Sequence, residues 1–213
     1  LLIDRILQGG DVSGIESLKW MDPLSVAELL RNEHPQIVAA ILVHLEFDQA
    51  ADVLKHLVLV RLLRHMNLKP KPYRVVDTHA GAGLYALDSP QALKKGEFLN
   101  GLSRLWAREN PPEAVADYLH CVRQLNPDGL LRTYPGSPWL VHSLLRAQDA
   151  LRLFELHPTE HQALQDTLSG SAGVEIRHGD GFAALKSQLP PPSRRAMVLC
   201  DPSYELKNDY ARV

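Results

Sequence analysis

Hydrophobic residues follow two different spacings along this chain of 213 residues, and the spacing changes near residue 67. Before that point, apolar positions recur every three to four residues, a spacing that predicts amphipathic helices. Breakers such as the glycine pair at residues 9–10 and the proline at residue 35 separate these helices. We therefore expect only short helices in residues 1–49, followed by a longer helix that Asp48 caps and that runs toward Met66.

Beyond the Lys-Pro-Lys-Pro breaker at residues 69–72, short apolar runs of strand length alternate with helical segments. Strands are predicted at residues 73–77, 150–156, 174–177 and 196–201. Helices are predicted within residues 90–126, from residue 138 to about 145, and at residues 158–168 and 181–189. Strands that alternate with helices indicate an α/β fold built on a parallel, doubly wound sheet.

Composition narrows the class of protein further. Hydrophobic residues make up 45% of the chain and charged residues 23%, as in ordinary globular proteins, and no apolar run reaches the length of a membrane span. The sequence shows no signal-peptide pattern, and its two cysteines, Cys121 and Cys200, lie far apart, which favours a reduced cytoplasmic protein. No pair of cysteines or histidines has the spacing of a metal site.

Charge is distributed unevenly along the chain. Residues 1–49 contain three Lys/Arg and eight Asp/Glu, whereas residues 50–213 contain twenty Lys/Arg and seventeen Asp/Glu. This asymmetry is the first indication that two pieces of different origin are joined. The mildly basic second piece is compatible with RNA binding but does not establish it.

Acidic residues stand at the ends of the predicted strands, where open parallel sheets bind ligands. Asp77 ends the first strand, and a turn with Gly81 and Gly83 follows, where glycines let a ligand approach the backbone closely. Glu155 closes the second strand and can accept hydrogen bonds from ribose hydroxyls, and Asp180 after the third can meet an adenine amino group. A single carboxylate at a strand end is usually a helix cap, but the repetition favours a nucleotide-type ligand.

The distance between the glycine turn and Glu155 is unusual for such a site. A plain dinucleotide-binding fold places the ribose-binding acid about 20 residues after the glycines. Here Glu155 comes far later. Either this assignment is wrong, or residues 84–147 form an inserted helical subdomain.

Five segments together resemble the motif series of the RlmJ family, bacterial enzymes that make N6-methyladenosine in large-subunit ribosomal RNA. These segments lie at residues 77–83, 134–138, 155–158, 180–182 and 201–205. The resemblance runs from about Ala51 to Val213 and implies a Rossmann-like sheet that uses S-adenosylmethionine. The insertion is a trait of that family, which explains the late Glu155.

The resemblance also implies a role for each matching residue. The S-adenosylmethionine site would be formed by Lys55, His56, Asp77, His79, Gly81, Gly83, Ser137, Glu155, Asp180 and Gly181. Lys55 is expected to pair with the carboxylate of the cofactor. Asp201 would be the catalytic residue, acting together with Pro202 and Tyr204, and no metal is required.

These residue types suit methyl transfer to an adenine amine, whose lone pair is delocalised into the ring. The Asp201 carboxylate and the Pro202 carbonyl can accept its hydrogens and hold the nitrogen in line with the sulfonium methyl. Tyr204 can stack on the extruded base, and Ser203, where the family motif has proline, should loosen the loop. Simpler interpretations remain open: Asp201 as a helix cap, His79 as a turn residue and Tyr204 as a packing residue.

The first fifty residues resemble a different family. Residues 13–21 and 33–45 are similar to the middle domain of FliG, the flagellar motor switch protein. The resemblance implies a docking surface for the switch protein FliM at Glu33, His34, Pro35 and Gln36. We therefore divide the chain into a small all-α segment, residues 1–50, and a methyltransferase domain, residues 51–213, and interpret it as a chimera.

Three functions follow from these resemblances. The chain can be an adenine-N6 methyltransferase of ribosomal RNA, a FliG-like module that binds FliM, or a non-functional fusion. We expect the opening Tyr/His-rich segment of the RlmJ family to be missing before residue 51, and the sheet to be C-terminally truncated by three strands. The methyltransferase hypothesis accounts for the most motifs, with activity that these losses can impair.

Overall fold

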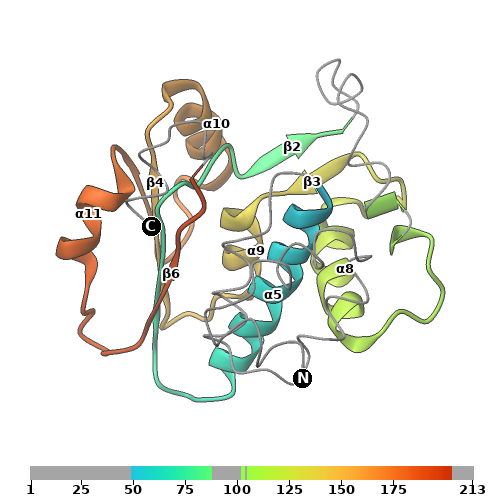
Figure 1. Cartoon of the computed structure of the whole chain (residues 1–213), viewed down its shortest axis with the longest axis horizontal. Helices are drawn as coiled ribbons and strands as arrows, with labels where there is room; N and C mark the ends of the chain where they lie inside the picture. The colour runs from blue at the N-terminus through green and yellow to red at the C-terminus, as the bar shows by residue number, and fades with distance from the viewer. Residues whose placement is uncertain (1–48, 88–101, 104, 203–213) are drawn as a thin grey trace, which may run out of the picture. The chain divides into compact units, whose positions relative to one another are not determined.

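The computed structural model describes residues 49–87, 102–103 and 105–202, with side chains from residue 52 onward (Figure 1). Residues 33–36 and Tyr204, to which the sequence assigned roles, lie outside the described residues. The chain divides into two compact units, one of residues 1–58 and 90–119, the other of residues 59–89 and 120–213. In the described part, no helix combines the length and the apolar character that crossing a membrane requires.

Two helices continue from one unit into the other, and the remaining elements belong to the second unit. The two helices are α5 (Gln49–Asn67) and α8 (Glu113–Leu125). The other elements are β1 (Arg74–Asp77), β2 (Leu84–Ala86), β3 (Thr133–Pro135), α9 (Ser137–Leu144), β4 (Ala150–Glu155), α10 (Pro158–Leu168), β5 (Val174–His178), α11 (Gly181–Gln188) and β6 (Ala196–Leu199).

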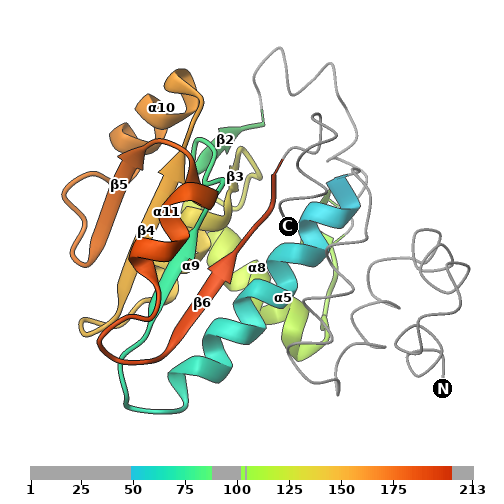
Figure 2. The same ribbon diagram turned by 60° about the vertical axis from the view of Figure 1, so that its left-hand side comes forward.

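Four parallel strands form the main sheet in the order β5-β4-β1-β6, which confirms the predicted parallel α/β architecture (Figure 2). The register pairs Asp77 of β1 with Leu153 of β4 and with Leu199 of β6. The carboxyl ends of these strands therefore meet at one edge of the sheet. Val75, Val76 and Leu151 are fully buried, as expected for strands covered on both faces.

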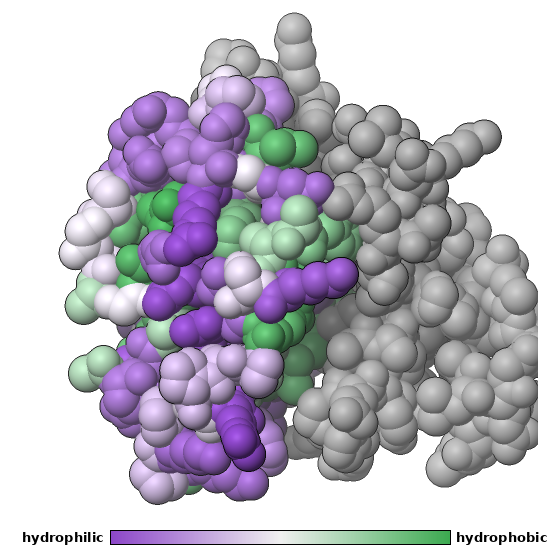
Figure 3. Space-filling view, turned by 90° about the vertical axis from the view of Figure 1, so that its left-hand side faces the viewer, coloured by the Kyte–Doolittle hydropathy of each residue, from purple (hydrophilic) through white to green (hydrophobic). Residues whose placement is uncertain are grey.

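Helices α10 and α11 cover the sheet. Crossovers between parallel strands are right-handed, and the chain moves outward from β4 to β5 and back to β6, so the two helices lie on opposite faces. Leu164 and Leu168 are the buried residues of α10, and Arg74 Nη1 donates to the Gln188 carbonyl of α11 at 2.9 Å. Figure 3 shows hydrophilic side chains spread over this side of the molecule from its upper to its lower end, with hydrophobic side chains between them.

The elements agree closely with the sequence-based expectations, apart from one short ribbon. The long helix, the four strands and the helices at 158–168 and 181–189 form within about two residues of the predicted bounds. Strands β2 and β3, which were not predicted from the sequence, pair antiparallel with Tyr85 opposite Tyr134. Strands of three residues are too short to show alternation between polar and apolar positions.

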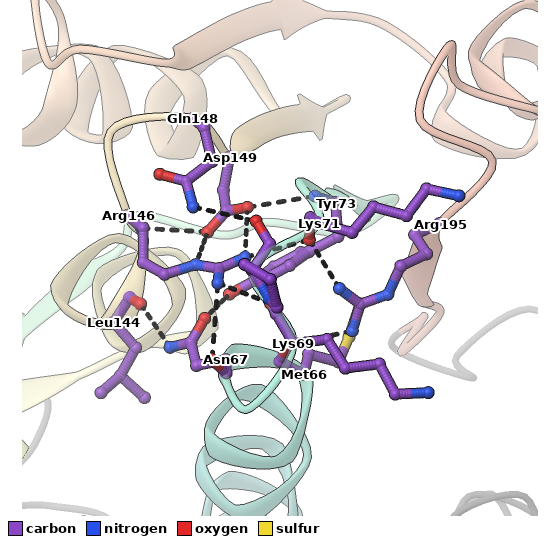
Figure 4. Close-up of polar contacts among 11 residues, drawn as sticks. Met66, Asn67, Lys69, Lys71, Tyr73, Leu144, Arg146, Gln148, Asp149 and Arg195 are labelled. Atoms are coloured by element: carbon purple, nitrogen blue, oxygen red, sulfur yellow. Dashed lines mark hydrogen bonds and ion pairs between the residues drawn. The ribbon is translucent and has the colours of Figure 1, made fainter.

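A polar cluster around Tyr73 ties together the segments that enter β1, β4 and β6 (Figure 4). Asp149 accepts hydrogen bonds from the Tyr73 amide at 3.0 Å and from Arg146 Nε at 2.7 Å. The Tyr73 hydroxyl donates to Asn67 at 3.0 Å, and the guanidinium groups of Arg146 and Arg195 lie 5.4 and 5.7 Å from its ring centroid. Burial alone would raise the pKa of Asp149, but the hydrogen bonds from Arg146 and two backbone amides outweigh it and lower that pKa.

Candidate cofactor site

Asp77, the last residue of β1, is completely buried at the carboxyl edge of the sheet. Its two carboxylate oxygens accept from Ser137 Oγ at 2.7 Å and from the His79 amide at 3.2 Å. Burial raises the pKa of Asp77 to about 7 although these two hydrogen bonds lower it, and the charges of Asp201 and Glu155 raise it further. Three carboxyl groups predicted from separate strand ends are therefore close enough to interact.

The turn after β1 depends on its glycines. Gly81 and Gly83 have φ angles of 62° and 81°, in the left-handed region that favours glycine. A Cβ on Gly83 would lie 3.0 Å from Leu164 of α10, and the Gly83 carbonyl accepts from the Gly136 amide at 2.8 Å. The turn is thus held in place by the segment that leads into Ser137.

Glu155 connects the end of β4 to the same turn. Its Oε2 accepts from the Gly81 amide at 2.7 Å, and its Oε1 accepts from the His157 amide at 2.7 Å. An ionised carboxylate offers about four acceptor positions, so each oxygen keeps capacity for another donor such as a ribose hydroxyl. Glu155 therefore both braces the turn and can serve as a ligand-binding acceptor.

Asp180 and Gly181 form the start of α11. Asp180 Oδ1 accepts from the amides of Phe182 and Ala183 at 2.9 and 3.3 Å, so this carboxylate caps the helix. Gly181 is buried directly against Thr78, and a Cβ there would collide with the Thr78 carbonyl oxygen. The cap fixes the direction of the Asp180 carboxylate, and the glycine lets the helix terminus reach the turn after β1.

His79 is held between three elements at this edge. Its Nδ1 lies 2.8 Å from Thr78 Oγ1, which itself donates to the Leu199 carbonyl of β6 at 3.1 Å. Because the hydroxyl proton is used in that bond, we assign the Nδ1–H tautomer to His79. The ring meets Phe182 of α11 edge-on, with centroids 4.8 Å apart. These contacts fix His79 in the turn after β1, and His79 is half-buried beside the predicted site.

Asp201 and Pro202 follow β6 and extend beyond the edge at which Asp77 ends. Asp201 is half-buried and Pro202 is buried. Lys55 and His56 lie on α5 within the other compact unit, where Lys55 Nζ is 3.5 Å from Asp52. Their part in the cofactor site stays a prediction.

Tyr85 in β2 is a site residue that the sequence analysis missed. A Cβ on Gly81 would collide with its hydroxyl, and one on Gly136 would lie 3.2 Å from its ring. The Ala82 amide donates to the Tyr85 hydroxyl, and burial of that group, with the charge of Glu160, raises its pKa to about 12. An aromatic residue two positions after the glycines was the available signal, but the short β2 gave it no structural context.

Known proteins share both the sequence and the fold of this region. The family model described as "Ribosomal RNA large subunit methyltransferase D, RlmJ" matches residues 70–213. The chain belongs to the RlmJ family. Ribosomal RNA large subunit methyltransferase J of Escherichia coli K12 is 44% identical over 163 residues, which are 76% of this chain and 58% of that protein. The enzyme of the same name from Haemophilus influenzae is 44% identical over 161 residues, 75% of this chain and 57% of its own.

A solved structure shares the fold of this region. The crystal structure of a Legionella pneumophila protein superposes with a TM-score of 0.70 at 39% identity, and the match covers 76% of this chain and 59% of that one. The chain therefore spans somewhat less than three fifths of the relatives that it matches. Both the resemblance to the RlmJ family and the α/β fold that were predicted from the sequence are confirmed.

The FliG-like start is confirmed as a resemblance as well. The FliG middle domain model matches residues 23–59. FliG of Vibrio cholerae is 53% identical over 53 residues, which are 25% of this chain and 15% of that protein. The sequence thus joins a FliG-like stretch to an RlmJ-family region, as the uneven charge indicated.

Proposed function

We propose that the RlmJ-family region binds S-adenosylmethionine at the carboxyl edge of the sheet and methylates an adenine N6 in large-subunit ribosomal RNA. The observation that carries this proposal is the joint placement of Glu155 and Asp77 around one glycine turn. Glu155 accepts a hydrogen bond from the Gly81 amide, and Asp77 accepts one from the Ser137 hydroxyl. Strand ends from three parts of the chain thereby form one polar site next to Asp201.

The residues present suit this cofactor. The free acceptor positions of Glu155 fit two ribose hydroxyls, and the capped carboxylate of Asp180 can accept from an adenine amino group. The glycines keep side chains away from the turn, so a ligand can contact the backbone. The cofactor supplies an electrophilic methyl group on a sulfonium. In the described residues, no group of three or more His, Cys, Asp and Glu is placed to hold a metal.

Asp201 and Pro202 supply the acceptors for the target amine. Their carboxylate and carbonyl oxygens can each take one hydrogen of the adenine N6, which directs the nitrogen lone pair toward the methyl group. Holding two reactants in line in this way can provide a large share of the rate enhancement. The proton that N6 loses after methylation can pass to the Asp201 carboxylate or to water. Tyr204 is proposed to stack on the extruded base.

Calorimetric titration of the whole chain with S-adenosylmethionine tests the site, and methylation of ribosomal RNA tests the reaction. We expect Asp201→Ala to reduce methyl transfer at least a thousandfold while the cofactor affinity changes less than threefold. Asp201→Asn, which keeps the shape and one acceptor oxygen, should retain more activity than Asp201→Ala. Failure of the folded wild-type chain to bind the cofactor would refute the proposal, and loss of binding in Asp201→Ala would assign Asp201 a structural role.

A second candidate function rests on the FliG-like stretch. The match of residues 23–59 to the FliG middle domain favours a FliM-binding role for Glu33, His34, Pro35 and Gln36. We adopt the methyltransferase function because the RlmJ match covers far more of the chain. Immobilised FliM that fails to retain the chain would exclude the second candidate.

A further inference from the structure

Positive charge is concentrated in two segments of the sequence. Residues 59–76 contain five Lys/Arg and no Asp/Glu, and residues 181–200 contain three Lys/Arg and no Asp/Glu. Arg195 immediately precedes β6, and its carbonyl accepts from the Arg74 amide at the start of β1. The two basic segments therefore meet where the parallel strands begin.

Two arginines fix the backbone of the loop between α5 and β1. Arg146 donates to the carbonyls of Lys69 and Lys71 at 2.8 and 3.2 Å, and Arg195 donates to the Lys71 carbonyl at 2.6 Å. Arg195 also donates to the Met66 carbonyl at 2.9 Å. These bonds hold the lysine backbones without using the lysine side chains.

The side chains of Lys69 and Lys71 extend away from this cluster (Figure 4). Both residues are exposed, and within the part of the chain that the structure describes neither ammonium group has a hydrogen bond or an ion pair. Arg194 is also exposed, and its φ of 53° presents it on a tight turn beside Arg195. A cation held on a fixed backbone loses less conformational entropy when it binds an anion.

Asp149, the acidic residue of the polar cluster, does not neutralise these cations. Asp149 has a side chain with no exposed surface, and its carboxylate is fully engaged by Arg146 and the Tyr73 amide. The surface formed by Lys69, Lys71, Arg194 and Arg195, here called the strand-entry surface, is therefore positive. Repeated phosphates, as in a nucleic acid backbone, are the natural partner for such a row of cations.

We propose that the strand-entry surface binds the phosphate backbone of the RNA whose adenine is presented at the opposite edge. This inference rests on the proposed methyltransferase function for the choice of RNA. Strands of four to six residues separate the two edges by roughly 13 to 20 Å, less than the roughly 34 Å turn of a nucleic acid duplex. One RNA stem can thus contact both edges.

RNA suits this surface better than an anionic membrane does. Binding to a lipid surface normally combines basic residues with an apolar face that enters the bilayer. Here Leu68, exposed to 77%, is the one large hydrophobic side chain of the loop with such exposure, and an isolated exposed leucine is common on protein surfaces. Phosphate contacts without apolar insertion predict binding that depends strongly on salt and little on sequence.

The test compares Lys69→Gln/Lys71→Gln with the matched double variant Arg108→Gln/Arg132→Gln, which removes two exposed cations elsewhere. Arg132 pairs with Asp128 in an exposed ion pair, so its loss should change the field of the strand-entry surface little. The probe is a fluorescent RNA stem-loop from large-subunit ribosomal RNA, titrated with the full chain without cofactor at several salt concentrations. S-adenosylmethionine binding is measured for every variant by calorimetry.

We expect the lysine variant to bind the RNA about five- to tenfold more weakly, with a salt dependence shallower by roughly 1.5 in log–log slope. The control variant should match wild type, and cofactor affinity should stay unchanged in both. Equal losses in the two variants, wild-type RNA affinity in the lysine variant, or binding to phosphatidylserine vesicles without RNA binding would each overturn the inference. Absent cofactor binding with a selective RNA defect would instead refute the proposed function alone.

Discussion

The amino-terminal and carboxyl-terminal edges of the four-stranded sheet each contain a buried aspartate, but the two carboxylates differ in their hydrogen-bond partners and in the direction in which their pKa is shifted. At the amino-terminal edge, Asp149 meets a guanidinium and two backbone amides, so its pKa is lowered and the charge is fully compensated. At the carboxyl-terminal edge, Asp77 meets one hydroxyl and one amide, with two further carboxylates nearby, and its pKa rises to about 7.

Within one sheet, this difference separates a carboxylate that stabilises the fold from carboxylates that remain available to a ligand. The compensated edge joins Asn67, Tyr73, Arg146 and Arg195 into bonds that stay within the chain. The other edge combines glycines with Asp77, Glu155 and Asp201, and the charges of Glu155 and Asp201 raise the pKa of Asp77. A carboxyl group with a perturbed pKa, as found for Asp77, is typical of functional sites.

The largest expected effect concerns the compensated edge. Arg146→Ala leaves the buried Asp149 without its main partner and frees the carbonyls of Lys69 and Lys71. We expect the free energy of unfolding in urea to fall by about 3 to 5 kcal/mol. Arg132→Ala, which breaks only an exposed ion pair, should cost under about 1 kcal/mol. Similar losses in both variants would show that the cluster is not a special source of stability.

The next expected effect is a dependence of stability on pH that comes from Asp77 at the carboxyl-terminal edge. The folded-state pKa of Asp77, about 7, is above its unfolded value of 3.8, so the folded chain holds this proton more tightly. Its contribution to stability is therefore greatest below pH 4 and is lost as pH rises toward and through 7. Each tenfold difference in proton affinity between the folded and unfolded chain corresponds to about 1.4 kcal/mol, so the free energy of unfolding should change on the order of 4 kcal/mol.

Asp77→Asn isolates this contribution because it keeps the shape and removes the titration. The difference in unfolding free energy between wild type and variant, measured by urea denaturation from pH 4 to 8, should change in favour of the variant as pH rises. A difference that stays constant over this range would mean that Asp77 does not titrate as described.

The smallest effect separates two roles of Asp180. Asp180→Ser keeps an N-cap for α11 but removes the carboxylate, whereas Asp180→Ala removes both. We expect Asp180→Ala to lower stability by about 1 kcal/mol and Asp180→Ser to leave it nearly unchanged. Calorimetry should show weaker S-adenosylmethionine binding in both. Wild-type affinity in Asp180→Ser would reduce Asp180 to a helix cap.

Local sequence signals predicted much of the fold and the composition of the site, but not its contacts. The strands, the helices and the glycine turn follow from spacing and residue type within short windows. The bond from Gly81 to Glu155 and the bond from Ser137 to Asp77 carry no such signal. They depend on strand order and register, which bring together segments that no local window compares. The contact of Tyr85 with Gly81 is local, but β2 has only three residues, too few to show the alternation that would have predicted a strand there.

The contacts that close the cofactor site also govern when it can form during synthesis. Ser137 meets Asp77 across 60 positions of sequence, Gly81 meets Glu155 across 74, and Thr78 meets Leu199 across 121. Contacts of such separation form late and slowly, because closing a long loop costs conformational entropy before the new contacts can stabilise the chain. A ribosome must therefore release nearly all of the RlmJ-family region before the turn after β1 acquires its final neighbours.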